Sequence, residues 1–272
     1  MPFNSLSQED IDLSDQILIL STVAVGNVSQ LCTDVLLCNL KLTKIGYFTD
    51  PSLIPFVAHD ALATTEKECK GEICLGCDVY RCTDSPLVIM QQRCPLVPNS
   101  RQFFSRNLCD WIQSSGFRQV VLLTGSHARQ RVDTQIRGSQ YRYFLSETTS
   151  STDAKETLQT LNWQALEEVH GGHDAMGAQV TGTAKSHFQE LSRRKIPTVG
   201  FTYFCNEGEN TVEGVAFAGK VQQYLDTLSV ISSEAENVKE EEKKQPEPTQ
   251  QLRVPLAWSR CYGPPPERSI YT

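Results

Sequence analysis

Four cysteines that lie within fourteen residues could, by their type, bind a metal: Cys69, Cys74, Cys77 and Cys82. Cys74 and Cys77 have the C-x-x-C spacing that zinc and redox sites use. A zinc site needs turns that bring its thiolates together, whereas the segment ICLGCDVY is typical of extended backbone, on which residues three apart point to opposite faces. We therefore interpret these cysteines as structural, and we predict neither a metal nor another cofactor.

Ser126 and His127 follow the apolar run QVVLLTG, and their side chains could act as a nucleophile and a base. The ends of such strands are where α/β enzymes place catalytic groups. The string GSHA is not the G-x-S-x-G elbow of hydrolases, and adjacency in sequence does not make the hydrogen bond that a Ser/His mechanism needs. We favour a loop-structuring role for these residues with Arg131 and Asp133. The alternative function is a hydrolase or phosphorylase-like enzyme that uses strand-end residues near Gly26 and Ser126.

Gly26 lies between an apolar run and a helical pattern, a position where backbone amides can bind phosphate. The surrounding string VGNVSQL lacks the further glycines of a dinucleotide-binding fingerprint, and the sequence contains no GxxxxGK[ST] motif. A structural turn is the better interpretation. His170 and His173 lie beside Asp174 in VHGGHDAMG, where the glycines are typical of a loop rather than of a preorganised metal site.

The last three residues, Ile270, Tyr271 and Thr272, carry a different chemistry. They offer an apolar group, an aromatic ring with a hydroxyl, and a carboxylate that a lysine can pair with. This order matches the hydrophobic-tyrosine-any-residue (HbYX) ending by which proteasome activators insert into pockets between α-subunits. The nine residues from Pro264 can span roughly 28 Å when extended. We predict that this segment contacts a partner; a frayed terminus is the alternative.

Apolar runs and helical spacing predict alternating strands and helices. Strands are predicted at 16–25, 44–48, 72–80, 86–92, 119–123 and 198–204. Helices are predicted at 28–40, 100–115 and 183–194, and a last helix follows Asn210, which can cap it with Glu213 three residues later. Strand, helix and strand at the start predict a parallel crossover unit. The expected fold is α/β, with a mostly parallel sheet flanked by helices in a single layered domain.

After Leu228 the composition changes to a charged, proline-containing stretch. We predict an α/β domain at 1–230, a flexible acidic and polar linker at 231–251, and a docking segment with a C-terminal tail at 252–272. Within the last segment, Val254, Leu256, Trp258 and Tyr262 supply apolar surface for docking on the domain.

Charge and hydropathy restrict the class of partner. The net charge is −7 and the isoelectric point is near 5.3, so nothing favours nucleic acid or an anionic membrane surface. No apolar run approaches the roughly 18 residues of a membrane-spanning helix. The start of the sequence is acidic and polar, unlike a secretory signal, so we expect a cytoplasmic and nuclear protein.

Several stretches resemble the proteasome assembly chaperone 2 family: VAVGNVSQLCTDVLL with KIGYF, LCDWIQSSGFRQVVLLTGSHARQRVDTQIRGSQYRYFL, LNW, and the CNEGEN turn before the last helix. The resemblance spans most of residues 17–265. It implies a chaperone without catalysis that forms a heterodimer with proteasome assembly chaperone 1 and promotes assembly of the α-ring of the 20S proteasome. Contact with proteasome α-subunits would fall on Ile270, Tyr271 and Thr272. Residues 148–184 fit the family poorly and receive no role.

Overall fold

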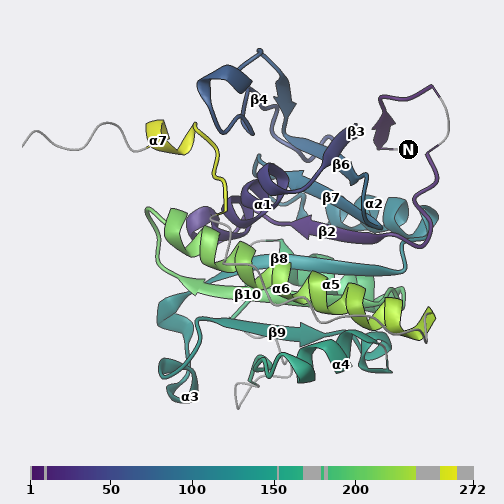
Figure 1. Cartoon of the computed structure of the whole chain (residues 1–272), viewed down its shortest axis with the longest axis vertical. Coiled ribbons are helices and arrows are strands. Elements are labelled where there is room, and N and C mark those ends of the chain that lie inside the picture. The colour runs from purple at the N-terminus through teal and green to yellow at the C-terminus, as the bar shows by residue number, and fades with distance from the viewer. Residues whose placement is uncertain are drawn as a thin grey trace, which may run out of the picture.

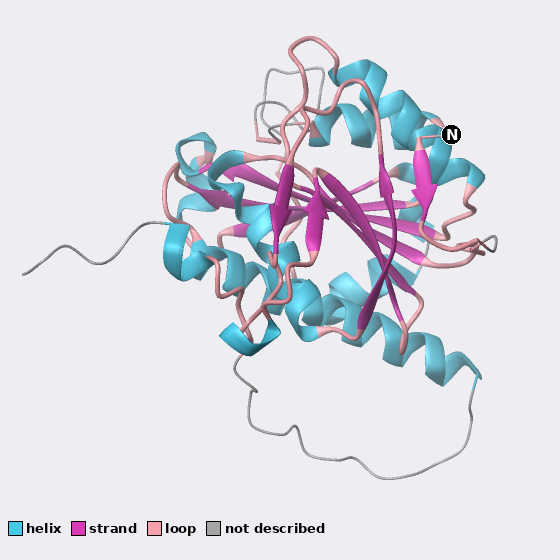
Figure 2. Cartoon of the chain, turned by 90° about the horizontal axis from the view of Figure 1, so that it is seen from above, coloured by secondary structure: helices cyan, strands magenta, loops and turns pink. Residues whose placement is uncertain are grey.

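An eight-stranded sheet forms the centre of the molecule, and helices cover both of its faces (Figures 1 and 2). This computed structural model describes residues 2–8, 11–151, 153–167, 179–180, 183–236 and 252–261. The strand order is β1-β3-β6-β7-β2-β8-β10-β9. The strands are β1 (Phe3–Ser5), β2 (Ile17–Ser21), β3 (Leu42–Phe48), β6 (Cys77–Cys82), β7 (Leu87–Gln92), β8 (Gln119–His127), β9 (Tyr141–Leu145) and β10 (Thr198–Cys205).

The four central strands, β7, β2, β8 and β10, are parallel to one another, and the outer pairs are antiparallel. The central strands read as continuous apolar runs because both of their faces are covered. Successive side chains on β2 alternate between the two faces. Ile17 and Ile19 join one apolar cluster, whereas Leu18 and Leu20 join the other.

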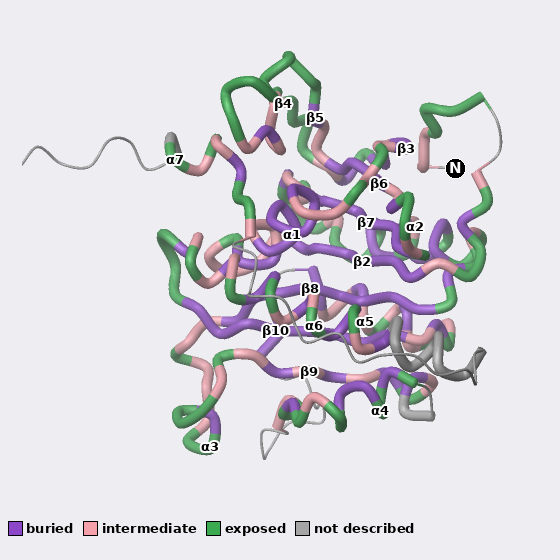
Figure 3. The backbone as a smooth tube through the Cα atoms, viewed as in Figure 1, coloured by how far each residue is buried: buried purple, intermediate pink, exposed green. Residues whose placement is uncertain are grey.

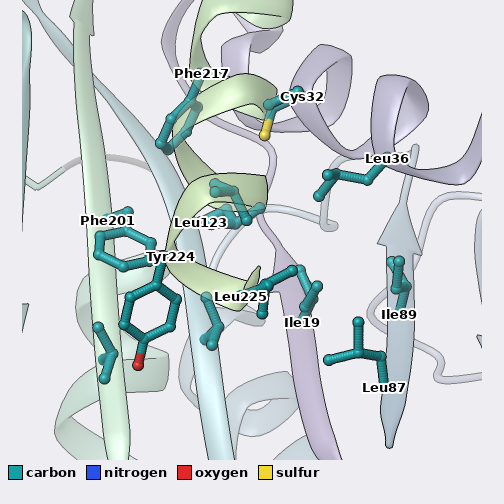
Figure 4. Close-up of a cluster of buried hydrophobic side chains, with 14 of the residues drawn as sticks. Ile19, Cys32, Leu36, Leu87, Ile89, Leu123, Phe201, Phe217, Tyr224 and Leu225 are labelled. Carbon is teal, nitrogen blue, oxygen red and sulfur yellow. The ribbon is translucent and has the colours of Figure 1, made fainter. Parts of the chain in front are cut away.

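The helices divide between the two faces of the sheet. One face packs against α1 (Val28–Asn39), α4 (Asp153–Thr160) and α6 (Thr211–Glu236), and the other packs against α2 (Arg101–Ser114) and α5 (Ala184–Arg193). Figure 4 shows the first cluster, in which Phe217, Tyr224 and Leu225 of α6 face Phe201 of β10 and Leu123 of β8. Each large apolar side chain buried in this way stabilises the fold by about 1.5–3 kcal/mol.

A two-stranded antiparallel sheet of β4 (Val57–His59) and β5 (Ile73–Leu75) is separate from the main sheet. It projects from the β3 and β6 side of the molecule, and much of its backbone trace is exposed (Figure 3). The remaining elements are short: α3 (Asp133–Ile136), α7 (Trp258–Cys261) and the 3-10 turns η1 (Val25–Asn27), η2 (Glu66–Glu68), η3 (Ala128–Gln130) and η4 (Glu147–Ser151). Among the described helices, none combines the length and the apolarity needed to cross a bilayer.

The predicted α/β class and the layering of helices on a sheet are confirmed. The helices predicted at 28–40, 100–115 and 183–194 correspond to α1, α2 and α5, each within one residue of the predicted bounds. The first crossover differs from the prediction in one respect. β3 runs in the same direction as β2, but β6 and β7 lie between them, so the two strands are not neighbours.

Other observed elements differ from their predicted bounds for physical reasons. The strand expected at 72–80 divides at Gly76, where a Cβ atom would lie 2.6 Å from the sulfur of Cys94. β8 continues through His127, because its pairing with β10 extends to Cys205. α6 continues to Glu236, since alanine and glutamate near its end favour helix. The division into a domain at 1–230, a linker and a tail stays a prediction.

Candidate partner-binding site

The turn predicted at Gly26 is present, and neighbouring groups fill the space above it. Gly26 has a positive φ of 59°, and a Cβ atom there would lie 2.3 Å from Nδ2 of Asn210 and 2.7 Å from the carbonyl oxygen of Asn206. The Asn210 amide donates to the carbonyls of Asn206 (2.9 Å) and Gly208 (3.0 Å). The loop before α6 therefore closes the carboxyl end of β2, where a phosphate would otherwise bind.

Asn210 precedes α6 as predicted, but another side chain accepts from the first turn of the helix. The Glu209 carboxylate accepts the backbone N–H of Thr211 (2.8 Å) and its hydroxyl. These hydrogen bonds lower the pKa of Glu209, and a carboxylate at this end also suits the helix dipole. The predicted position of the helix start is thus correct, whereas the predicted capping residue is not supported by the contacts.

Ser126 and His127 belong to β8 rather than to a loop, and Ser126 is fully buried. The Ser126 hydroxyl donates to Oε1 of Gln130 at 3.2 Å. In the part of the chain that the structure describes, the His127 ring makes no hydrogen bond or ion pair with a carboxylate or hydroxyl. Arg131 donates through Nε to the Ala128 carbonyl (3.3 Å), which fixes the turn after the strand. This geometry does not present a nucleophile and base to a substrate.

A buried ion pair, which the sequence analysis did not identify, anchors the loop after β8. The Arg142 side chain is fully buried, and its Nε donates to both carboxylate oxygens of Glu167 at 3.2 and 3.1 Å. Gln135 also donates to Glu167. Burial raises the pKa of Glu167, but the hydrogen bonds from Gln135 and Arg142 outweigh it, so the net shift is downward. The network holds the loop in one arrangement, at the position where the enzyme interpretation placed chemistry.

The four clustered cysteines do not share one element. Cys69 is exposed, whereas Cys74 on β5 and Cys77 and Cys82 on β6 are buried. Burial, with a smaller effect of the neighbouring Cys94, raises the pKa of Cys77 well above that of a free thiol. Over the described ranges, no group of three or more histidine, cysteine or acidic residues is arranged to hold a metal ion.

Residues 252–261, here called the strap, pack on the domain. The Asn39 amide exchanges two hydrogen bonds with the backbone of Arg253, at 2.8 and 3.0 Å, and the Arg253 guanidinium donates to the Cys38 carbonyl. Further along, the N–H of Leu256 donates to the Ala63 carbonyl at 2.8 Å. The strap thus links the end of α1 to the segment near β4, and α7 lies at its end (Figure 1).

A cleft of about 490 Å³ lies between the strap and the first turns of α6. Val212 and Val215 of α6 line it, opposite Val254 and Trp258 of the strap. Leu252 and Trp258 also pack against the apolar cluster beneath α6. Apolar contacts therefore add to the hydrogen bonds that hold the strap.

Two groups of candidate residues lie outside the described part of the chain. They are Ile270, Tyr271 and Thr272 in the tail, and His170, His173 and Asp174 in the glycine-rich segment. Their roles stay as the sequence predicts them.

The sequence model of the PAC2 family matches residues 18–243, most of the chain. The chain belongs to the PAC2 family. Among curated relatives, it is similar to a protein named proteasome assembly chaperone 2 from Nematostella vectensis, with 34% identity over 227 residues, or 80% of this chain and 92% of that protein. The protein of the same name from Homo sapiens is 28% identical over 261 residues, or 93% of each chain.

Solved structures agree with this family at the level of the fold. The chain resembles Pyrococcus furiosus PbaB, described as an archaeal proteasome activator, with a TM-score of 0.61 and 15% identity over 86% of this chain and 96% of that one. It also resembles PbaA from the same organism, described as an archaeal homolog of proteasome-assembly chaperone. There the TM-score is 0.56, with 15% identity over 86% of this chain and 94% of that one. At this identity the likeness shows the family fold alone.

Proposed function

We propose that this chain is a chaperone that promotes assembly of the α-ring of the 20S proteasome. The observation that carries the proposal is its membership of the PAC2 family, over residues 18–243. Support comes from the curated relatives named proteasome assembly chaperone 2, since the match covers more than nine-tenths of the sea-anemone and human proteins.

The proposed mechanism uses two contacts. The chain forms a heterodimer with proteasome assembly chaperone 1, and Ile270, Tyr271 and Thr272 enter a pocket between proteasome α-subunits. The anchored strap supports a separate role for the tail. Because the strap is bonded to the domain, the eleven residues after Cys261 start from a fixed place on the domain and can reach at most about 40 Å from it. A tether of this length raises the effective concentration of the terminal residues at the ring surface. The pair would act in the cytoplasm and the nucleus.

The closed strand ends count against the alternative of a hydrolase or phosphorylase-like enzyme. Catalysis by Ser126 would require an accessible hydroxyl within reach of a base, whereas this hydroxyl is buried and bonded to Gln130. The turn at Gly26 is covered by Asn206 and Asn210. A chaperone that acts through its surfaces needs neither an accessible nucleophile nor an open site at the strand ends.

Co-purification from the cell tests the proposal, with the intact chain compared with one that lacks Ile270 to Thr272. The truncated chain should keep the partner chaperone and retain at least ten-fold less of the α-subunits. Thr272→Ser is the matched control, because the motif accepts any last residue and the carboxylate stays in place; it should behave as the intact chain does. Equal recovery of α-subunits by the truncated chain would contradict the tail contact. If the intact chain captures neither partner, the proposed function is wrong.

A further inference from the structure

Exposed apolar side chains gather on the β4–β5 lobe, which we define as residues 52–76 together with residues 95–97. Its large apolar residues with more than a third of their surface exposed are Ile54, Phe56, Val57, Ile73 and Val97. The two parts of the lobe are joined by backbone hydrogen bonds from Ile54 to Pro95 (3.2 Å) and from Val97 to Ser52 (2.7 Å). Figure 3 shows this exposed region projecting beyond the main sheet. An apolar patch of this kind marks an interaction surface.

The backbone of β4 shows which kind of partner fits this surface. The N–H of Asp60 donates to the Glu72 carbonyl at 2.8 Å, and Ala58 pairs with Cys74 two residues along. In an antiparallel ladder these alternate residues exchange the inter-strand hydrogen bonds. The N–H and C=O groups of Val57 and His59 therefore point away from β5, at the free edge of β4.

The two edges of the small sheet differ. On β5 one outward group of each residue is bonded to the main sheet: Lys44 of β3 donates through Nζ to the Ile73 carbonyl (3.1 Å), and the N–H of Leu75 donates to the carboxylate of Asp78 on β6 (3.0 Å). On β4, no group among the described residues pairs with the outward backbone of Val57 or His59. The edge of β5 is thus partly bonded to the main sheet, whereas the edge of β4 is open, and an open edge is a template for a further strand.

We propose that an extended segment of the partner chaperone adds to β4 as a third strand, and that the adjoining surface of the partner covers the side chains of Val57 and Ile73 on one face of the small sheet. The identity of this partner rests on the proposed function. An open strand edge beside an apolar patch promotes aggregation unless it is covered throughout the life of the protein. A permanent partner meets this need, and permanent interfaces are also the more apolar class.

The charges beside the edge specify the partner segment further. From His59 to Glu72 the chain carries four carboxylates and two lysines. An acidic border favours a partner strand that is flanked by lysine or arginine. The expected ligand is therefore a short run of alternating apolar residues with a basic flank, bound chiefly by main-chain hydrogen bonds.

A matched pair of substitutions tests the apolar contact. Ile73 on the lobe is 61% exposed and Ile136 on α3 is 60% exposed, so lysine should be tolerated by the fold at both positions. Ile73→Lys places a charge on the covered face of the small sheet and should weaken the binding of the purified partner chaperone at least ten-fold, measured by titration calorimetry. Ile136→Lys should leave the dissociation constant within two-fold of the unchanged chain.

A second variant tests the strand edge itself. Val57→Pro removes an N–H that points outward and leaves the hydrogen bonds between Ala58 and Cys74 in place, as proline is tolerated at edges of this kind. It should also weaken partner binding at least ten-fold, and it decides the question if Ile73→Lys does not fold. Binding by both variants as tight as that of the unchanged chain would overturn this inference and leave the proposed function standing.

Two other results would show whether the proposed heterodimer or only the proposed occupant of the edge is wrong. If the unchanged chain binds no partner chaperone, the proposed heterodimer fails and the inference fails with it. If Ile73→Lys and Val57→Pro instead convert a homodimer of this chain into a monomer, with partner binding intact, the occupant of the edge is a second copy and the committed partner is wrong.

Discussion

Two glycines with positive φ lie in opposite surroundings in two regions of the molecule. At the carboxyl ends of the parallel strands, Gly26 has a φ of 59° and is covered by Asn206 and Asn210; on the β4–β5 lobe, Gly71 has a φ of 78° and no atom within 4 Å of the position of a Cβ. The first region is where an α/β enzyme would open a site, and here it is filled. The second region leaves a strand edge and apolar side chains uncovered. The contrast favours a protein that acts by binding.

Alanine at the two glycines should give the largest difference. Both variants bear the strain of a positive φ, which costs about 1–2 kcal/mol for a residue with a Cβ. Gly26→Ala must in addition displace Asn210, so we expect its free energy of unfolding to fall by about 3–4 kcal/mol. Gly71→Ala should lose only the strain. Urea denaturation of both variants measures the two values.

Equal destabilisation by the two alanine variants would break the comparison. It would mean that the loop before α6 moves aside at little cost, and that the strand ends are not held closed. A ligand could then enter above Gly26, and this result would support the enzyme interpretation.

Two histidines extend the same contrast to pH. His187 on α5 is fully buried, its ring centroid lies 5.6 Å from that of Phe104, and neither ring nitrogen has a hydrogen-bond partner within the described ranges. Burial, with a smaller effect of the Arg101 charge, lowers the pKa of His187 to about 3. The unfolded chain takes up a proton near pH 6.5 and the folded chain does not, so acid stabilises the unfolded state. His59 on the lobe is exposed.

The free energy of unfolding should therefore fall by about 2 kcal/mol between pH 7 and pH 5. His187→Leu should remove most of this fall, whereas His59→Leu should retain it. The carboxylates whose pKa values are depressed, such as Glu190, lose their contribution only below about pH 4.5, outside this window. An unchanged pH dependence in His187→Leu would show that water or a polar group reaches the buried ring.

The core elements were predicted well because burial in the core requires apolar residues at regular positions in the sequence. β2, β7 and β10 are buried on both faces, so their sequences are continuous apolar runs, and α1, α2 and α5 carry helical spacing. β9 was not predicted. Its sequence YRYFL places Arg142 in the interior, and a buried arginine is tolerated only because Glu167, distant in sequence, pairs with it. A pairing of this kind leaves no local signal.

The candidate sites show the same limit. Ser126 was correctly placed near the carboxyl end of β8, but its burial depends on the place of the strand in the sheet, where Phe204 of β10 is its neighbour. β5 fell within the strand predicted at 72–80, but β4 and the separate small sheet were missed, because these strands are three residues long and an open edge is a property of pairing, not of composition. The strap was expected to dock, yet nothing local pointed to Asn39 as the residue that receives it.

The strap connects the two regions, and weakening it should give the smallest effect. Arg253 donates to the Cys38 carbonyl at the end of α1. Hydrogen bonds from Thr64 lower the pKa of Glu68 on the lobe, and the charge of Arg253 lowers it further by a smaller amount. Arg253→Ala keeps the backbone hydrogen bonds with Asn39 and loses the guanidinium contact. We expect the free energy of local opening to fall by about 1 kcal/mol.

Amide hydrogen exchange at Leu256 reports this opening, because its N–H bonds to the Ala63 carbonyl of the lobe. Arg253→Ala should exchange about five-fold faster at this amide, since 1 kcal/mol corresponds to roughly that factor. Arg129→Ala is the control, as Arg129 is exposed and makes no side-chain hydrogen bond or ion pair with any described residue. If exchange at Leu256 stays the same in Arg253→Ala, the apolar contacts of Leu252 and Trp258 are enough to hold the strap. Apolar packing would then hold the strap between the lobe and the core, and a change of charge on the lobe surface would not loosen the strap.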